Sequence, residues 1–187
     1  MKGLIMQLKG KTAIITGGGS GFGASMADLF AKNGAKVIVA DIDLDSARKV
    51  AEGTGGYPLE VDVSSAKSVE QMKIEIFKEY EKVDIVVNNA GTTHLPAPME
   101  TIEEDEFDRV FNVNCKSVYL TAKHFVPHFK KNKSGVILNI ASTAGVSPRP
   151  NLNWYNSSKG WMILASKTMA VELAPFGIRV NVINPVA

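Results

Sequence analysis

The sequence has little of several features that would mark particular classes of protein. Its 187 residues contain one cysteine, Cys115, so neither an internal disulfide nor a cysteine-based zinc site is expected. No hydrophobic run approaches the roughly 20 residues of a membrane span, and residues 1–11 carry no run of signal-peptide length. The formal net charge is only +2, which does not favour nucleic-acid binding. These absences predict a cytoplasmic protein with no nucleic-acid or membrane partner.

Short β-branched runs alternate with helix-length segments along the whole chain. Strands are predicted at residues 12–16, 36–41, 57–63, 83–90, 135–142 and 178–185, and the helices between them include 22–32 and 154–174. Runs such as Ile14-Ile15 are hydrophobic without alternation, so both faces of the sheet should be covered by helices. We therefore predict an α/β fold, a doubly wound parallel sheet in three α/β/α layers, within one domain over residues 1–187.

The last predicted strand lies at the very end of the chain, with only Val186 and Ala187 after it. In an open α/β sheet, ligands bind beyond the carboxyl ends of the strands. The segment that follows the last strand would therefore carry part of the site. We expect further residues to be missing after Ala187.

Two groups of residues could suggest a metal site, but each has a simpler interpretation. The acidic residues 103–106 follow Thr101, which with Glu104 would form a capping box at a helix start, where carboxylates also favour the helix dipole. His124 and His128 are four residues apart, but no third ligand is evident. We predict no bound metal.

The first predicted strand runs into a glycine-rich turn that opens a helix. Such a turn brings backbone amides and a helix N-terminus against a pyrophosphate. The spacing is Gly-x-x-x-Gly-x-Gly, and a flexible turn without a ligand is the alternative interpretation. The cofactor-binding residues predicted here are Gly17, Ser20, Gly21, Phe22 and Gly23.

Asp41 ends the second predicted strand, about twenty residues after the glycine turn. A carboxylate there can accept hydrogen bonds from the adenosine ribose hydroxyls. It would repel a 2′-phosphate, and neither Gly18, Gly19 nor Ile42 supplies a neutralising cation. The alternative is that Asp41 is a turn or cap residue before Asp43. The pattern predicts NAD, rather than NADP, as the cofactor.

Tyr155 and Lys159 lie four residues apart in a predicted helix, so their side chains share one face. A tyrosine is a poor base at neutral pH because its ordinary pKa is about 10, and roughly 3–4 kcal/mol of phenolate stabilisation is needed to change this. A nearby lysine and a nicotinamide cation can supply it. Since Tyr-x-x-x-Lys is common on helix surfaces, its position relative to other motifs decides its meaning.

Four features together resemble the short-chain dehydrogenase/reductase family in order and spacing. These are the glycine turn, the run Asn88-Asn89-Ala90-Gly91, Ser142, and the pair Tyr155 and Lys159. The resemblance extends from about Leu8 to the last residue. It implies a Rossmann-like sheet, with six strands visible here and the family's usual seventh missing, together with the substrate loop that accompanies it.

The resemblance also implies catalytic roles for four residues. Tyr155 would exchange a proton with the substrate oxygen while a hydride moves to or from nicotinamide. Lys159 would stabilise the phenolate and hold the nicotinamide ribose. Ser142 would hydrogen-bond the substrate oxygen. Asn114, in the run Phe111-Asn-Val-Asn114, would hold a relay water next to the lysine.

Further cofactor contacts follow from the same resemblance. It places Asp62 and Val63 near the adenine, and it places Asn89 with its two following residues near the adenosine ribose, although Asn89 could equally bridge strands. Pro185 precedes Val186, where many family members have glycine. The remaining predicted cofactor-binding residues are Ile42, Ala90, Gly91, Tyr155, Lys159 and Pro185.

The leading functional hypothesis is an NAD-dependent oxidoreductase that acts on a secondary alcohol, sugar or polyol, or on the corresponding ketone. A 3-oxoacyl-acyl-carrier-protein reductase and a non-catalytic NAD-binding module are the alternatives. The resemblance also implies a homo-oligomer, a tetramer or a dimer. The hydrophobic run Trp161-Met-Ile-Leu164 and Met169 could form its interface or could pack against the sheet.

Overall fold

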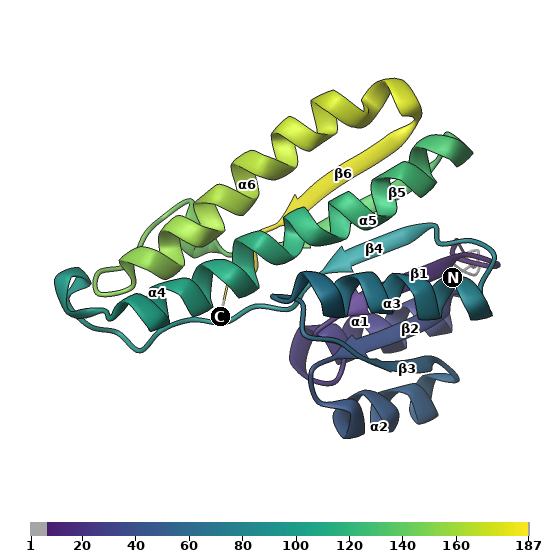
Figure 1. Cartoon of the computed structure of the whole chain (residues 1–187), viewed down its shortest axis with the longest axis horizontal. Helices are drawn as coiled ribbons and strands as arrows, with labels where there is room; N and C mark the ends of the chain where they lie inside the picture. Colours follow the sequence, from purple (N-terminus) through teal and green to yellow (C-terminus); the bar gives the residue numbers. More distant parts are fainter. Residues whose placement is uncertain (1–6, 187) are drawn as a thin grey trace, which may run out of the picture.

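Six parallel strands form one sheet in the computed structural model, which describes residues 7–186 (Figure 1). Their spatial order is β3-β2-β1-β4-β5-β6, so the direction of winding reverses between β1 and β4. In sheets of this kind, ligands bind at that reversal point. The doubly wound fold is thereby confirmed. The strands are β1 (Thr12–Thr16), β2 (Lys36–Asp41), β3 (Tyr57–Glu60), β4 (Ile85–Asn88), β5 (Gly135–Ile140) and β6 (Ile178–Ile183).

Four strands are shorter at their carboxyl ends than predicted. The predictions for 57–63, 83–90, 135–142 and 178–185 all extend past the last ladder residue, and that for β4 also begins too early. After β4 the reason is visible, because the backbone N–H groups of Asn89 and Ala90 donate to the hydroxyl of Thr16 instead of to a neighbouring strand.

Helices cover both faces of the sheet, as the uninterrupted hydrophobic strands predict. Side chains of α1 and α2 pack on one face, and side chains of α3, α5 and α6 pack on the other. Figure 1 shows α5 and α6 running side by side along β5 and β6. These helices are α1 (Gly21–Lys32), α2 (Leu44–Thr54), α3 (Ala66–Glu79), α5 (Ser117–Asn132) and α6 (Asn153–Leu173).

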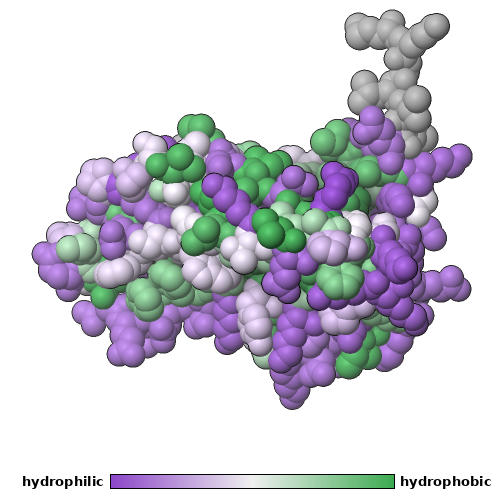
Figure 2. Space-filling view, turned by 90° about the horizontal axis from the view of Figure 1, so that it is seen from above, coloured by the Kyte–Doolittle hydropathy of each residue, from purple (hydrophilic) through white to green (hydrophobic). Residues whose placement is uncertain are grey.

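The surface mixes hydrophilic and hydrophobic side chains. On the face seen in Figure 2, hydrophobic residues lie in small groups between hydrophilic ones. None of the helices within residues 7–186 has the length and hydropathy needed to cross a membrane.

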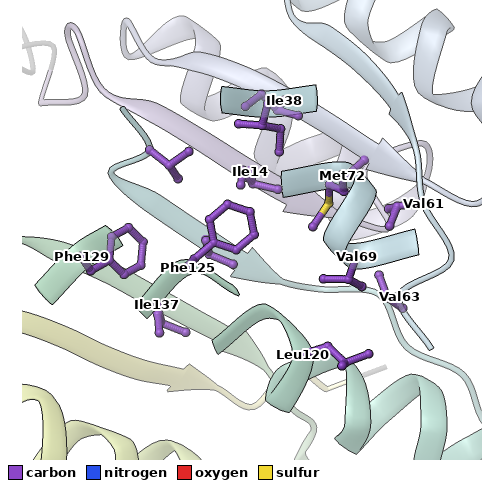
Figure 3. Close-up of a cluster of buried hydrophobic side chains, with 14 of the residues drawn as sticks. Ile14, Ile38, Val61, Val63, Val69, Met72, Leu120, Phe125, Phe129 and Ile137 are labelled. Atoms are coloured by element: carbon purple, nitrogen blue, oxygen red, sulfur yellow. The ribbon is translucent and has the colours of Figure 1, made fainter. Parts of the chain in front are cut away.

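The larger hydrophobic core lies between the sheet and α3, α5 and α6 (Figure 3). Phe125 and Phe129 of α5 are almost completely buried there, beside Ile137 of β5. Met72 of α3 fills the part of the core over Ile14. These large side chains anchor α5, whose N-terminal extension carries part of the site.

The helix α4 (Glu104–Phe111) does not begin with the predicted capping box. Glu103 is the N-cap, and no side chain caps it. Thr101 instead lies in the 3₁₀ turn η1 (Met99–Thr101), and its hydroxyl donates to the carbonyl of Pro98 at 2.8 Å. The capping prediction was wrong because this extra turn precedes the helix. The acidic residues of the first turn do lie where the helix dipole favours them.

A π-helical segment, η2 (Asn112–Lys116), joins α4 to α5. Such segments are rare and are frequent at functional sites. Here Asn114 and Cys115 point inward and are buried. Further along the same helical rod, Nε2 of His128 lies 3.3 Å from the backbone nitrogen of Val83, so this histidine joins α5 to the sheet.

A chain of buried polar side chains runs from α5 over β4 and β5 to α6, on the face of the sheet that both helices cover. Thr121 of α5 donates to Oδ1 of Asn88 at 2.8 Å, and Nδ2 of Asn88 donates to Oδ1 of Asn139 at 2.7 Å. Nδ2 of Asn139 then donates to the hydroxyl of Ser166 on α6 at 2.8 Å. All four residues are buried. Since buried amides are costly unless they are hydrogen-bonded, the chain ties both helices to adjacent strands.

Replacing Asn139 by alanine should therefore lower the free energy of unfolding by roughly 2–4 kcal/mol, because it leaves a buried donor on Asn88 unsatisfied and removes the partner of Ser166. Urea denaturation measures the change. Asn181→Ala, at an exposed position of β6, is the matched control and should change the free energy by less than about 0.5 kcal/mol. Equal effects of the two substitutions would contradict the assigned role of the buried chain.

Candidate active site

The glycine turn between β1 and α1 is tight enough to require its glycines. Gly17 and Gly21 have φ angles of 61° and 52°, in the left-handed region. A Cβ on Gly23 would lie 2.0 Å from the carbonyl oxygen of Gly17. Ser20 is the N-cap of α1, and its side chain makes no capping hydrogen bond. The first N–H groups of α1 are therefore available to an anionic ligand.

A cleft of about 630 Å³ opens beside this turn at the carboxyl edge of the sheet. It brings together eleven of the predicted cofactor residues, from four separate parts of the chain. Val61, Ser64, Arg109, Val113 and Thr92 also line it and were not predicted. The predicted residues are Gly17, Ser20, Gly21, Phe22, Asp41, Ile42, Asp62, Val63, Asn89, Ala90 and Gly91.

Asp41 is held rigidly at the end of β2. Its Oδ2 accepts from the backbone of Gly19 at 2.8 Å, and its Oδ1 accepts from the backbone of Asp43 at 3.1 Å. Asp43, rather than Asp41, is the N-cap of α2. The carboxylate of Asp41 thus braces the glycine turn and lines the cleft at once, so the two interpretations of this residue are compatible.

Asn89 bridges the two central strands. Its Nδ2 donates to the carbonyl oxygens of Thr16 at 2.9 Å and of Gly17 at 3.0 Å. In the opposite direction, the backbone N–H of Asn89 donates to the hydroxyl of Thr16 at 3.0 Å. Asn89 therefore bridges the strands, which was one of its two predicted roles. Its partner Thr16 was not predicted from the sequence. A buried threonine immediately before the glycine turn was the available signal.

A second hollow of about 240 Å³ adjoins the cleft and contains three of the four predicted catalytic residues, Ser142, Tyr155 and Lys159. Pro185 lines it as well. Its wall shares Phe22 and several other residues with the nucleotide cleft, so the two spaces are neighbours. A ligand bound across both would reach from the glycine turn to Tyr155.

Lys159 is almost completely buried, at 4% exposure. Its Nζ donates to the carbonyl oxygen of Ile140 at 2.9 Å and lies 5.9 Å from the centre of the Tyr155 ring. Burial lowers the pKa of Lys159 to about 8. The same burial raises the pKa of the adjacent Cys115 thiol to about 11, although Lys159 opposes this shift. Cys115 is therefore a protonated, inert neighbour of the lysine.

Asn114 lies outside the hollow's lining and acts through hydrogen bonds. Its Oδ1 accepts from the backbone N–H of Thr92 at 2.9 Å, while its Nδ2 donates to the carbonyl of Thr92 and to the hydroxyl of Ser158. That hydroxyl donates to the backbone carbonyl of Tyr155 at 2.7 Å. Asn114 is thus linked to the first turn of α6, and Ser158 is a site residue that the sequence reasoning overlooked.

Ser142 follows β5 and caps the 3₁₀ turn η3 (Thr143–Gly145). Its Oγ accepts from the backbone N–H of Ala144 at 3.1 Å. A hydroxyl that accepts can still donate its own proton. The geometry thus leaves Ser142 able to donate a hydrogen bond to an oxygen placed between it and Tyr155.

Comparison with known proteins gives a consistent result. A family profile described as short chain dehydrogenase matches residues 11–187. The chain is 44% identical to 4-formylbenzenesulfonate dehydrogenase of Comamonas testosteroni, covering 96% of this chain and 73% of that protein. It is 38% identical to a 3-oxoacyl-acyl-carrier-protein reductase of Thermotoga maritima, covering 96% of this chain and 75% of the relative.

Two solved structures are similar over most of the chain. The 3-ketoacyl-acyl-carrier-protein reductase of Brucella melitensis, complexed with NADH, is 47% identical with a TM-score of 0.95, covering 97% of this chain and 77% of that one. An NAD⁺-bound xylitol dehydrogenase is 30% identical with a TM-score of 0.90, covering 96% and 71%.

The buried amine of Lys159 makes stability depend on pH. Its pKa is about 8 in the folded chain and 10.5 ordinarily, so between these values the unfolded chain binds more protons and a rise in pH favours folding. From about pH 7 to about pH 9.5, the wild type should gain roughly 2 kcal/mol of stability relative to Lys159→Met. Urea denaturation at several pH values tests this. Lys167→Met, at an exposed position of α6, is the control that keeps Lys159 and should gain as much as the wild type, whereas an equal gain in Lys159→Met would refute the assignment.

Proposed function

Because the chain belongs to the short-chain dehydrogenase family, we propose that it is an NAD-dependent oxidoreductase that oxidises a secondary alcohol, sugar or polyol, or reduces the corresponding ketone. The observation that carries this proposal is the hollow that joins Ser142, Tyr155 and Lys159 and adjoins the glycine-turn cleft. The xylitol dehydrogenase is named for a polyol and agrees with it, whereas 4-formylbenzenesulfonate dehydrogenase is named for an aldehyde and supports the dehydrogenase activity alone.

The cleft fits NAD on chemical grounds. A Cβ on Gly23 would clash with the turn, so the turn can keep its backbone amides close to a pyrophosphate. The carboxylate of Asp41 is fixed at the cleft wall and suits ribose hydroxyls. Its negative charge disfavours a 2′-phosphate, which supports NAD over NADP. When bound, NAD supplies the hydride acceptor.

The chain's own residues would manage the proton. In the oxidative direction, Tyr155 Oη takes the hydroxyl proton of the substrate while the carbon loses its hydride, and a ketone remains. Lys159 stabilises the phenolate, and its burial strengthens that attraction because the local dielectric is low. Ser142 donates a hydrogen bond to the same substrate oxygen. Asn114 orients the first turn of α6 through Ser158.

A 3-oxoacyl-acyl-carrier-protein reductase is the second candidate, supported by the relatives of that name in Thermotoga maritima and Brucella melitensis. A non-catalytic NAD-binding module is less consistent with the site, because all four predicted catalytic residues are retained in hydrogen-bonded positions or in the hollow. A cytoplasmic location remains a prediction.

A homo-oligomer, a dimer or a tetramer, is also proposed. A groove of about 410 Å³ runs between α5 and α6 and is lined by Tyr119, Trp161 and Leu164, among others. These three side chains are 54%, 41% and 67% exposed. Met162, in contrast, is completely buried. Within the run 161–164, Met162 therefore packs inward, whereas the exposed side chains of Trp161 and Leu164 would contact the second copy.

Turnover of NAD with a panel of secondary alcohols, sugars and polyols should be detectable by NADH absorbance. Tyr155→Phe should lower kcat by roughly 10²–10⁴-fold, because the general base is lost, whereas Tyr57→Phe on β3 should not. NAD should exceed NADP at least about tenfold in kcat/KM. Undiminished activity of Tyr155→Phe would contradict the mechanism, and equal use of NADP would contradict the role of Asp41.

Placing a carboxylate in the groove should weaken the oligomer. Leu164→Glu is expected to raise the dissociation constant at least about tenfold, since an unpaired charge would be buried on association. Sedimentation velocity measures this. Val171→Glu, on the same helix but outside the groove lining, is the control. A monomeric wild type would refute the proposed assembly.

A further inference from the structure

A short segment after β4 forms a wall shared by the two spaces of the site. Thr92 and Thr93 line the hollow that contains Tyr155, and Thr92 also lines the nucleotide cleft. This segment belongs to no helix or strand. Its backbone polar groups are therefore not paired within a helix or a strand, and side chains bind the N–H and the carbonyl of Thr92 and the carbonyl of Thr93.

Two side chains from the α4–η2 rod hold this segment. Asn114 binds the backbone N–H and the carbonyl of Thr92. One turn or so earlier, the guanidinium of Arg109 donates through Nη1 to the hydroxyl of Thr92 and through Nη2 to the carbonyl of Thr93 at 2.9 Å. The same Nη2 lies 2.7 Å from Oε2 of Glu106, in an ion pair within α4.

We propose that Arg109 is a positioning residue that fixes the Thr92–Thr93 wall between cofactor and substrate. The inference rests on the proposed function for its kinetic consequences, but the placement of the wall does not. A guanidinium is a planar fork with several fixed donors, so it can bind acceptors on two residues at once. A lysine in its place would be a single point donor.

Movement of the wall would reach the reacting groups directly. Gly91, which precedes it, is so close to Lys159 and Asn114 that a Cβ there would lie 3.2 Å from Nζ and 3.4 Å from Oδ1. Arg109 itself lines the nucleotide cleft. A loosened wall should therefore disturb substrate binding and the placement of Lys159 together.

The test compares Arg109→Met, Arg109→Lys and Glu106→Gln in the full chain. Hydrogen exchange of the backbone amides of residues 92–95, measured without ligand, reports the wall, and steady-state kinetics with NAD report its consequence. Arg109→Met should speed exchange of these amides at least about fivefold and lower kcat/KM about tenfold, the loss of roughly one hydrogen bond. Arg109→Lys should restore only part of both. Glu106→Gln, which removes the ion pair but keeps the fork, should stay within about twofold of the wild type.

The outcomes separate the inference from the proposed function. Equal effects of Arg109→Met and Glu106→Gln would overturn the inference, because Arg109 would then act only through its ion pair within α4. Full restoration by Arg109→Lys, or unchanged exchange in Arg109→Met, would overturn it as well. If the wild type showed no turnover, the proposed function would fail, while the exchange data would still decide the role of Arg109.

Discussion

Reciprocal hydrogen bonds between Thr16 and Asn89 join the carboxyl ends of β1 and β4. The Thr16 hydroxyl accepts from the backbone of Asn89 and of Ala90, and the Asn89 amide donates to the carbonyls of Thr16 and Gly17. Backbone groups beyond the ladder would otherwise lack partners. This exchange joins the glycine turn to the segment that follows β4, and so both spaces of the site depend on it.

Lys159 and Asn114, two of the predicted catalytic residues, lie where buried polar atoms are costly, and the surrounding hydrogen bonds make their burial possible. Lys159 is held by a strand carbonyl, and Asn114 is completely buried with every amide atom engaged. The π-helical segment turns Asn114 inward from a rod whose two ends are otherwise ordinary α-helix. The same hydrogen bonds therefore stabilise the fold and fix the geometry of the candidate site, since an unpaired Asn114 amide would cost stability and would release the backbone of Thr92.

Local pattern predicted the parts of the site that depend on chain geometry. The glycine turn was recognisable because its spacing reflects a close backbone approach, as the required absence of a Cβ at Gly23 shows. Asp41 was recognisable from its place at a strand end. The same logic failed at Thr101, because a residue that can cap a helix can also bind a nearer carbonyl. It also extended four strands past their last paired residues, into segments such as Asn89-Ala90 whose backbone groups bind a side chain instead.

The sequence by itself determined the layered α/β fold and the order of its motifs, because these follow from periodicity and spacing within short stretches of chain, and its resemblance to the short-chain dehydrogenases singled out Ser142, Tyr155 and Lys159 as candidate catalytic residues. Only the tertiary structure decided which other side chains hold the candidate site in place by hydrogen bonds. Thr92, Arg109 and Ser158 are common polar residues with no distinctive local pattern. Each of them is bound by a partner that lies between 16 and 44 residues away along the chain. Hydrogen bonding over such separations is fixed by how helices pack on the sheet, and no local pattern records it.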